Sequence, residues 1–136
     1  MLNVKRSFYW VTTALIALET FVGGFVDLTH GRTAIVSGPF VADFVTGLGY
    51  PVYVLWIIGV WKILGAITLI VPRFPRLKEW AYAGIVFELS GAVASLGASG
   101  RTADLTPPLF MLVLTLASWA LRPSSRTLGK PLIAQN

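Results

Sequence analysis

The chain has 136 residues and a net charge of +5; 55% of its residues are hydrophobic and only 12% are charged. Soluble domains carry about a quarter charged residues, so this chain has too few to cover a water-exposed surface. The composition excludes a disordered chain and argues against a soluble globule, and the absence of cysteine excludes a disulfide scaffold, thiol catalysis and thiolate metal sites. We expect residues 1–136 to form a single integral membrane domain.

Four apolar stretches are long enough to cross a bilayer, which takes about 20 mostly apolar residues. In chain order they cover, approximately, residues 8–28, 51–71, 79–97 and 107–121. Pro51 suits the first turn of the second span, and Thr106 is a candidate N-cap for the fourth. Because the fourth span is short, it must tilt or locally thin the bilayer.

The segments between the spans predict where the helices end. Residues 72–76 contain two prolines and residues 97–101 form a glycine-containing turn, so both segments interrupt the helices. After Ser37-Gly38-Pro39, a helical spacing of apolar residues predicts a short helix on the membrane surface. The residues of that pattern are Phe40, Val41, Phe44, Val45 and Leu48. The predicted fold class is all-α: a transmembrane four-helix bundle with a short interfacial helix in the first outer loop.

The basic residues are unevenly distributed between the two sides of the predicted spans. Arg32 and Arg101 lie on one side, whereas the other side has Lys5, Arg6, Arg73, Arg76, Lys78, Arg122, Arg126 and Lys130. The positive-inside rule then places both termini in the cytoplasm, with residues 122–136 as a cytoplasmic tail. We expect the membrane to be a bacterial cytoplasmic membrane. Topology accounts for the positive charge, and no recognition motif supports nucleic-acid binding.

Three charged residues lie inside the predicted spans: Glu19, Lys62 and Glu88. Counted from the cytoplasmic ends at 1.5 Å per residue, they lie about 14–16 Å deep, near the middle of a hydrocarbon layer about 30 Å thick. A charged group at that depth costs about 2.5–3.5 kcal/mol. We therefore expect the three side chains to face inward and to meet at one level, where small neighbouring residues let the helices approach.

Two interpretations of this site stay open, because two carboxylates and one ammonium do not balance. Either one of the two carboxyl groups stays protonated, or its carboxylate accepts a hydrogen bond from another donor. In the first interpretation the site transfers protons to a lipophilic substrate: Lys62 anchors a developing oxyanion, and Glu88 or Glu19 moves the proton. In the second, the charges only hold three helices in register. The side chains expected to line the surrounding cavity are Tyr53, Trp56, Trp61 and Ser95.

Two further polar residues lie near the outer end of the first span. We favour a hydrated side chain for Asp27; the alternative is that it extends the polar stripe toward an access path. His30 is the only histidine. As a metal ligand it would stand alone, so we expect no metal site.

We also expect the chain to form a homo-oligomer or to bind a partner subunit, because four short helices bury little surface. Glycines let helices approach closely in a membrane. The glycines expected to be exposed for such contacts are Gly23, Gly24, Gly59 and Gly65.

The second and third spans carry the most specific sequence pattern. Its segments are Leu48-Gly49-Tyr50-Pro51, Gly59-Val60-Trp61-Lys62-Ile63-Leu64-Gly65-Ala66, Pro72-Arg73-Phe74-Pro75-Arg76-Leu77-Lys78-Glu79-Trp80-Ala81-Tyr82-Ala83-Gly84 and Phe87-Glu88-Leu89-Ser90-Gly91-Ala92. Through them the chain resembles the DoxX-like family of small four-helix membrane proteins, over roughly residues 9–122. The resemblance matches Lys62 and Glu88 to the family's intramembrane charges. Many relatives have Ser-His where this chain has Ser95-Leu96, so any role of that histidine is absent here.

The resemblance implies a fold more than a reaction. The family's namesake is the small subunit associated with a thiosulfate:quinone oxidoreductase, and other relatives are linked to quinone or oxidative-stress systems. We expect a lipophilic small molecule, such as a bound quinone, with no intrinsic cofactor; an enzymatic activity would be acid–base or quinone-linked redox chemistry. The alternative is a non-catalytic accessory or scaffold subunit of a membrane complex. Proton-coupled transport is a weaker hypothesis, because no repeat of broken helices is present.

Overall fold

The computed structural model describes residues 2–30 and 40–128, and every regular element in that part of the chain is a helix. The elements are α1 (Leu2–Leu28), α2 (Phe40–Gly47), α3 (Val54–Ile70), α4 (Pro75–Ala98), η1 (Thr102–Leu105), α5 (Thr106–Ala120) and η2 (Ser124–Arg126). Arg32, Lys130 and the Ser37-Gly38-Pro39 segment, which contribute to the predicted topology, lie outside the described residues.

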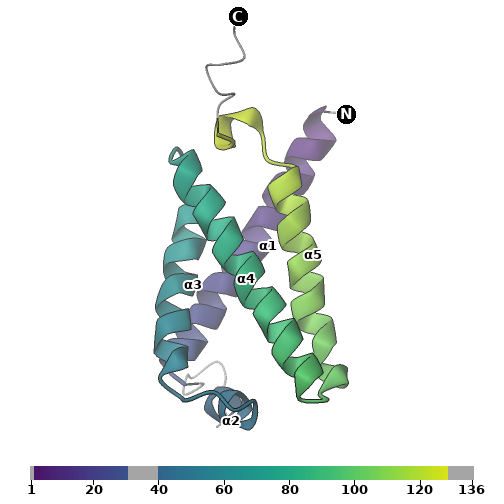
Figure 1. Cartoon of the computed structure of the whole chain (residues 1–136). Helices are drawn as coiled ribbons and strands as arrows, with labels where there is room; N and C mark the ends of the chain where they lie inside the picture. The colour runs from purple at the N-terminus through teal and green to yellow at the C-terminus, as the bar shows by residue number, and fades with distance from the viewer. Residues whose placement is uncertain (1, 31–39, 129–136) are drawn as a thin grey trace, which may run out of the picture.

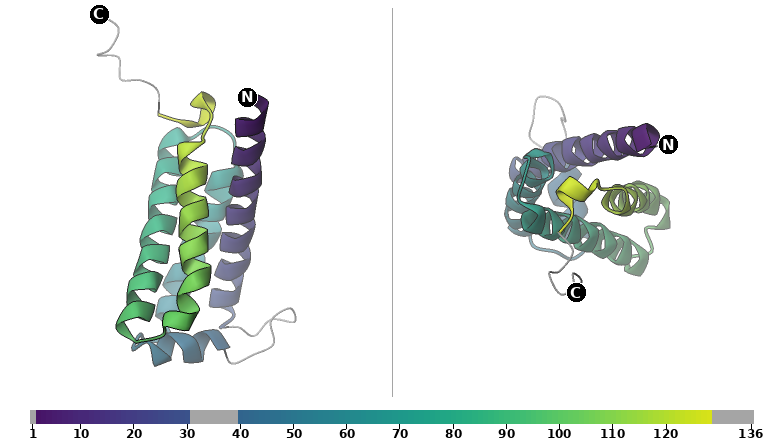
Figure 2. Two further views of the ribbon diagram at one scale, coloured as in Figure 1. Left: turned by 90° about the vertical axis from the view of Figure 1, so that its right-hand side faces the viewer. Right: turned by 90° about the horizontal axis from the view of Figure 1, so that it is seen from above.

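The long helices α1, α3, α4 and α5 lie side by side (Figure 1), and each packs against two of the others. Helix α1 contacts α3 and α5, and α4 contacts the same two helices. The short α2 lies across one end of this arrangement, whereas the beginning of α1 and η2 lie at the opposite end (Figure 2). A cluster of buried apolar residues lies at the core and contains Ile16, Ala17, Leu69, Tyr82 and Ile85.

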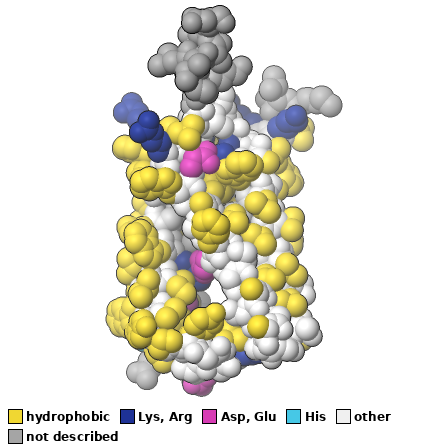
Figure 3. Space-filling model, in the orientation of Figure 1, with side chains coloured by type: hydrophobic (Ala, Val, Ile, Leu, Met, Phe, Trp, Pro, Cys, Tyr) yellow, Lys and Arg dark blue, Asp and Glu magenta, His cyan; other side chains and the backbone are white. Residues whose placement is uncertain are grey.

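Three segments are long and apolar enough to cross a membrane: Val4–Leu28, Pro75–Ala98 and Thr102–Ala120. The remaining predicted span, α3, is an apolar helix of 17 residues, at the lower limit of the range of about 17–25 residues that a crossing takes. Hydrophobic side chains cover most of the face seen in Figure 3. A protein in a bilayer exposes such side chains to lipid without cost, because acyl chains are as apolar as leucine.

The observed helix boundaries correct the predicted ones by about one turn. Helix α4 begins at Pro75 rather than near Glu79, because a proline at the first helical position loses no hydrogen bond. Pro51 does not belong to α3; its carbonyl oxygen accepts a turn hydrogen bond from the Val54 N–H at 3.1 Å. Thr106 is the first residue of α5 and not its N-cap, because the 3-10 helix η1 runs directly into α5.

Helices α1 and α3 approach most closely at two glycines. A Cβ atom on Gly24 would lie 2.9 Å from the Gly59 carbonyl oxygen, and a Cβ atom on Gly59 would lie 2.8 Å from the Gly24 carbonyl oxygen. Real Cβ atoms do not come this close to a backbone oxygen, so the contact requires glycine on both helices. The expectation that these two glycines are exposed for self-association is wrong, since both are buried within the chain.

Candidate functional site

Lys62 forms ion pairs with two carboxylates from different helices. Its ammonium nitrogen lies 3.0 Å from Asp27 Oδ2 and 2.9 Å from Glu88 Oε1. Lys62 is the central residue of α3, Asp27 lies near the end of α1, and Glu88 lies in the middle of α4. The side chains are 16%, 10% and 28% exposed, respectively. A largely buried cation therefore joins three helices.

The predicted pairing of Lys62 with Glu88 is present, but no ion pair with Glu19 occurs among the described residues. Glu19 is exposed. Its carboxylate lies near Gly23, where a Cβ atom would be 3.7 Å from Glu19 Oε1 and 3.4 Å from the Lys62 ammonium. Counting depth along the chain assumes parallel helix axes, whereas α1 crosses α3 at an angle (Figure 1). The level of Lys62 is that of Gly23, about one turn beyond Glu19.

The interpretation of Asp27 as a hydrated side chain is wrong. Asp27 is buried, with 7% of the whole residue exposed, and its carboxylate is the second one on the Lys62 ammonium. Its place follows from the close approach of Gly24 to Gly59, because Asp27 lies about one helical turn after Gly24. From the sequence, an inward-facing Asp27 was only the alternative, since the residue is near the end of its span.

A cavity of about 540 Å³, the α2 cavity, lies on one side of the ion pairs. Asp27, Lys62 and Glu88 form its polar lining together with Tyr50 and Ser95, whose hydroxyl groups are 2.6 Å apart. The rest of the lining is apolar and comes from α2, the start of α3 and the middle of α4. These residues are Val41, Phe44, Val45, Leu48, Val54, Leu55, Ile58, Phe87, Gly91 and Ala92.

Helix α2 closes one end of this cavity and is held there by contacts with the turn after α4. The Arg101 guanidinium lies 4.3 Å from the centre of the Phe44 ring, and Arg101 also pairs with Asp104 at 2.9 Å. The Tyr50–Ser95 hydrogen bond ties the segment between α2 and α3 to α4. Helix α2, the short helix expected from the sequence, therefore also forms one wall of the site.

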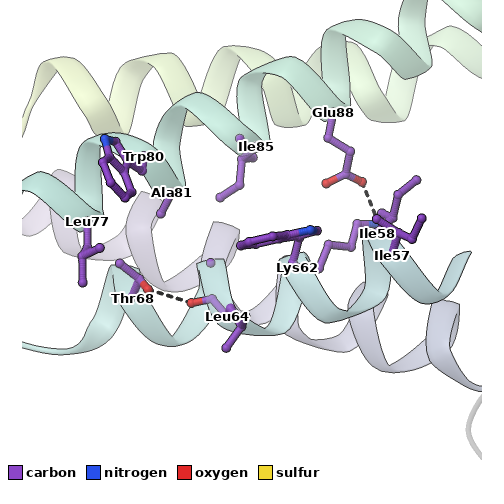
Figure 4. Close-up of a pocket in the computed structure, with 13 residues that line it drawn as sticks. Ile57, Ile58, Lys62, Leu64, Thr68, Leu77, Trp80, Ala81, Ile85 and Glu88 are labelled. Atoms are coloured by element: carbon purple, nitrogen blue, oxygen red, sulfur yellow. Dashed lines mark hydrogen bonds and ion pairs between the residues drawn. The ribbon is translucent and has the colours of Figure 1, made fainter. Parts of the chain in front are cut away.

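A second cavity of about 360 Å³, the α3–α4 cavity, lies on the other side of the ion pairs (Figure 4). It shares Ile58, Lys62 and Glu88 with the α2 cavity. Figure 4 shows Glu88 pointing from α4 toward Lys62 on α3. The other lining residues are Ile57, Trp61, Leu64, Gly65, Thr68, Leu77, Trp80, Ala81, Gly84 and Ile85.

Two of the four residues predicted to line the cavity do line one of the two cavities. Trp61 lines the α3–α4 cavity, and Ser95 lines the α2 cavity. Tyr53 and Trp56 are exposed and contribute to neither cavity. The Trp56 ring instead contacts the His30 ring edge-on, with 5.3 Å between the ring centres. Among the described residues, no group of metal-ligating side chains is large enough to hold a metal ion.

A second group of buried cations, Lys78 and Arg126, lies at the end of α3. The sequence had indicated only a topological role for these two residues. The Lys78 ammonium donates to three carbonyl oxygens: that of Thr68 at 2.5 Å, that of Leu69 at 3.1 Å and that of Val71. Arg126 donates to the carbonyl oxygens of Leu69 at 2.8 Å and Ile70 at 3.3 Å. The two cations thus satisfy the last carbonyls of α3.

A sequence signal for this group exists. The Thr68 carbonyl would normally accept from the N–H of residue 72, but Pro72 has none. The end of α3 therefore needs donors from elsewhere, and the next lysine after this end is Lys78.

One comparison with known proteins gives a match. The model of the DoxX-like family matches residues 11–118, which is most of the chain. No curated protein and no solved structure matches. Together with the long apolar helices, the family match makes this an integral membrane protein.

Proposed function

We propose that this chain, which belongs to the DoxX-like family, is a transmembrane four-helix bundle that binds a lipophilic small molecule at Lys62 and Glu88. The observation that carries the proposal is the position of this ion pair between two largely apolar cavities. Known ligand pockets have volumes of about 300–1,000 Å³ and a few polar groups within an apolar lining. The α2 cavity, at about 540 Å³, has this size and this composition.

The hydrogen-bonding capacity of Lys62 supports a ligand with an oxygen atom. An ammonium group has three N–H donors. Within residues 2–30 and 40–128, the Lys62 ammonium has two partners, Asp27 and Glu88. The third donor is available to a carbonyl or hydroxyl oxygen of a ligand in the adjoining cavity.

A quinone head group fits these residues. Its ring would contact the apolar lining of the α2 cavity, and one carbonyl oxygen would accept from the Lys62 ammonium. A bound quinone supplies two-electron redox chemistry. The chain's own contribution is to hold the head group, to exclude water and to keep protonatable carboxyl groups within reach of the bound oxygen.

The charge balance of the site supports a proton-transfer role for Glu88. Two carboxylates and one ammonium leave one excess negative charge, which a proton on one carboxyl group removes. Glu88 borders both cavities and is the more exposed of the two carboxylates. It is the candidate acid and base, Lys62 is the candidate stabiliser of an oxyanion, and Glu19 stays a candidate for relaying the proton past Gly23.

The orientation that we propose puts both termini in the cytoplasm of a bacterial cell. Several described Lys and Arg residues lie at the end of the molecule where α1 begins, and basic side chains are prominent there in Figure 3. They are Lys5, Arg6, Arg73, Arg76 and Arg122. Helix α2, at the opposite end, would then lie at the surface of the membrane that faces away from the cytoplasm.

The test uses the full chain purified in detergent. Lys62→Met combined with Glu88→Gln should abolish the quenching of tryptophan fluorescence by added tetramethylbenzoquinone, because the donor to the quinone oxygen is lost. This variant should also lose the lipophilic molecule that solvent extraction and mass spectrometry recover from the wild type. Glu88→Gln alone keeps the Lys62 ammonium and should keep the quenching. The matched control is Glu79→Gln combined with Arg122→Met, which removes another ion pair between helix ends. Unchanged quenching in the Lys62→Met, Glu88→Gln variant would contradict the proposal.

The accessory-subunit alternative rests on a specific observation, namely that Lys62 links α1, α3 and α4 through its two ion pairs. If the charges serve only helix register, both double variants should lower the thermal unfolding temperature by similar amounts. In that case neither wild type nor control would bind the quinone, and no lipophilic molecule would be extracted from either.

A further inference from the structure

Building on the proposed function, we infer that the ligand is a neutral, single-chain lipid. Its polar head lies in the α2 cavity against Lys62, and its chain lies in the α3–α4 cavity, which leads to the bilayer.

The two cavities meet at the ion pair. Ile58, Lys62 and Glu88 line both of them, so only these side chains separate the two cavities. A molecule that replaces Glu88 as a partner of the Lys62 ammonium would extend into both cavities. From Glu88 to Leu77, the α3–α4 cavity follows α4 for about 16 Å at 1.5 Å per residue. This shape suits an extended chain better than a ring system.

The chemistry of the two linings differs. The α2 cavity contains Asp27 and the hydroxyl groups of Tyr50 and Ser95 in addition to the shared ion pair. Beyond that ion pair, the α3–α4 cavity has one hydroxyl group, on Thr68, which already donates to the Leu64 carbonyl oxygen at 2.8 Å. The other donors in this lining are the indole N–H groups of Trp61 and Trp80. The α3–α4 cavity therefore offers a hydrocarbon chain a lining that is apolar apart from these two groups and Thr68.

The α3–α4 cavity opens toward the lipid-facing side of the molecule. Trp61 on α3 and Trp80 on α4 both line it, and they are 68% and 72% exposed. Figure 4 shows Trp80 and Leu77 on α4 opposite Thr68 and Leu64 on α3, in line with the ion pair of Lys62 and Glu88. A lipid chain can thus enter sideways between α3 and α4 and lie with its end among the surrounding acyl chains.

The depth and charge of the site select a neutral head group. Lys62 lies eight residues from either end of α3, about 12 Å at 1.5 Å per residue, whereas phospholipid head groups lie at the membrane surface. The carboxyl groups of Asp27 and Glu88 already offset the charge of Lys62, and the carboxylate of Glu19 lies close by. An anionic head would be repelled, whereas a carbonyl or hydroxyl group would be accepted.

Three glycines on α4 provide matched variants. Gly84 lines the α3–α4 cavity, Gly91 lines the α2 cavity, and Gly97 lines neither. A Cβ atom on any of the three would have no heavy atom within 4 Å, so a side chain can start at each position without a clash. The thermal unfolding temperature of each leucine variant checks that it folds. Leucine also has the higher helix propensity. Each substitution fills the space beside α4 at a different level.

The probes are tetramethylbenzoquinone, its analogue with a decyl chain in place of one methyl group, and decanoate as an anion with a similar chain. We expect the wild type to bind the decyl quinone most tightly and decanoate at least about tenfold more weakly, a difference of about 1.4 kcal/mol. Gly84→Leu should remove the advantage of the decyl chain and leave tetramethylbenzoquinone binding unchanged. Gly91→Leu should weaken both quinones, and Gly97→Leu should weaken neither.

The outcomes separate this inference from the proposed function. If Gly84→Leu leaves decyl-quinone affinity unchanged while Gly91→Leu lowers it, the head group binds in the α2 cavity as proposed, but the lipid chain does not lie in the α3–α4 cavity. If decanoate binds as tightly as the decyl quinone, the selection for a neutral head is wrong. If no quinone binds the wild type, the proposed function itself fails, and this inference fails with it.

Discussion

Two buried lysines, Lys62 and Lys78, differ in what surrounds their ammonium groups. Lys78 is 1% exposed and donates to three backbone carbonyl oxygens at the end of α3. Lys62 has two carboxylate partners, and its side chain borders two cavities. The first ammonium uses all three of its donors, and the second has one left.

The difference shows that a buried charge alone does not identify a binding site. The Lys78 ammonium completes a helix end that Pro72 leaves without donors, so its role is structural. The Lys62 ammonium lies beside space that a ligand can fill and has the capacity to bind it. The presence of adjoining space separates the two lysines more clearly than their burial does.

The largest effect on stability is expected for Lys78→Met. This substitution leaves carbonyl oxygens at the end of α3 without donors and should cost about 3 kcal/mol. Thermal unfolding in detergent should show a marked decrease, while quinone affinity of the folded fraction stays the same. The structural role assigned to Lys78 would be wrong if Lys78→Met removed quinone binding without loss of stability.

A smaller but still substantial effect is expected for Gly59→Leu, which forces α1 and α3 apart. Its Cβ atom would lie 2.8 Å from the Gly24 carbonyl oxygen, so overpacking should cost about 1–3 kcal/mol. The shift also separates Asp27 from Lys62, so quinone affinity should fall together with the unfolding temperature. The matched control on the same helix is Gly65→Leu, whose Cβ atom meets no heavy atom within 4 Å. Equal stability loss in both variants would contradict the role of the close approach.

The smallest effect on stability is expected for Phe44→Leu, which removes the cation–π contact with Arg101 and keeps the cavity lining apolar. The loss should be about 0.5–1 kcal/mol. Because α2 then closes the α2 cavity less firmly, the bound quinone should dissociate faster, as stopped-flow fluorescence can measure. An unchanged dissociation rate would show that the contact between Phe44 and Arg101 does not control release of the quinone.

The helices could be predicted from the sequence because their signals are local. Runs of apolar residues predicted the four long helices, and the spacing of Phe40, Phe44 and Leu48 predicted α2. The pairing of Lys62 with Glu88 followed from the cost of isolated charges in lipid. The second ion pair of Lys62 is with Asp27 and not with Glu19. Residue counting did not show this, because it gives depth only for helices with parallel axes.

The amino-acid sequence by itself determined that the chain is helical, that it belongs in a membrane, and that its intramembrane charges must find partners within the protein. These properties depend on composition and periodicity, which act within one helix at a time. Only the tertiary structure decided which carboxylate reaches Lys62, which lysine has a donor left, and where the cavities lie. Those features depend on the crossing of α1 and α3 at Gly24 and Gly59, and a crossing angle is set by side-chain packing between helices distant in sequence.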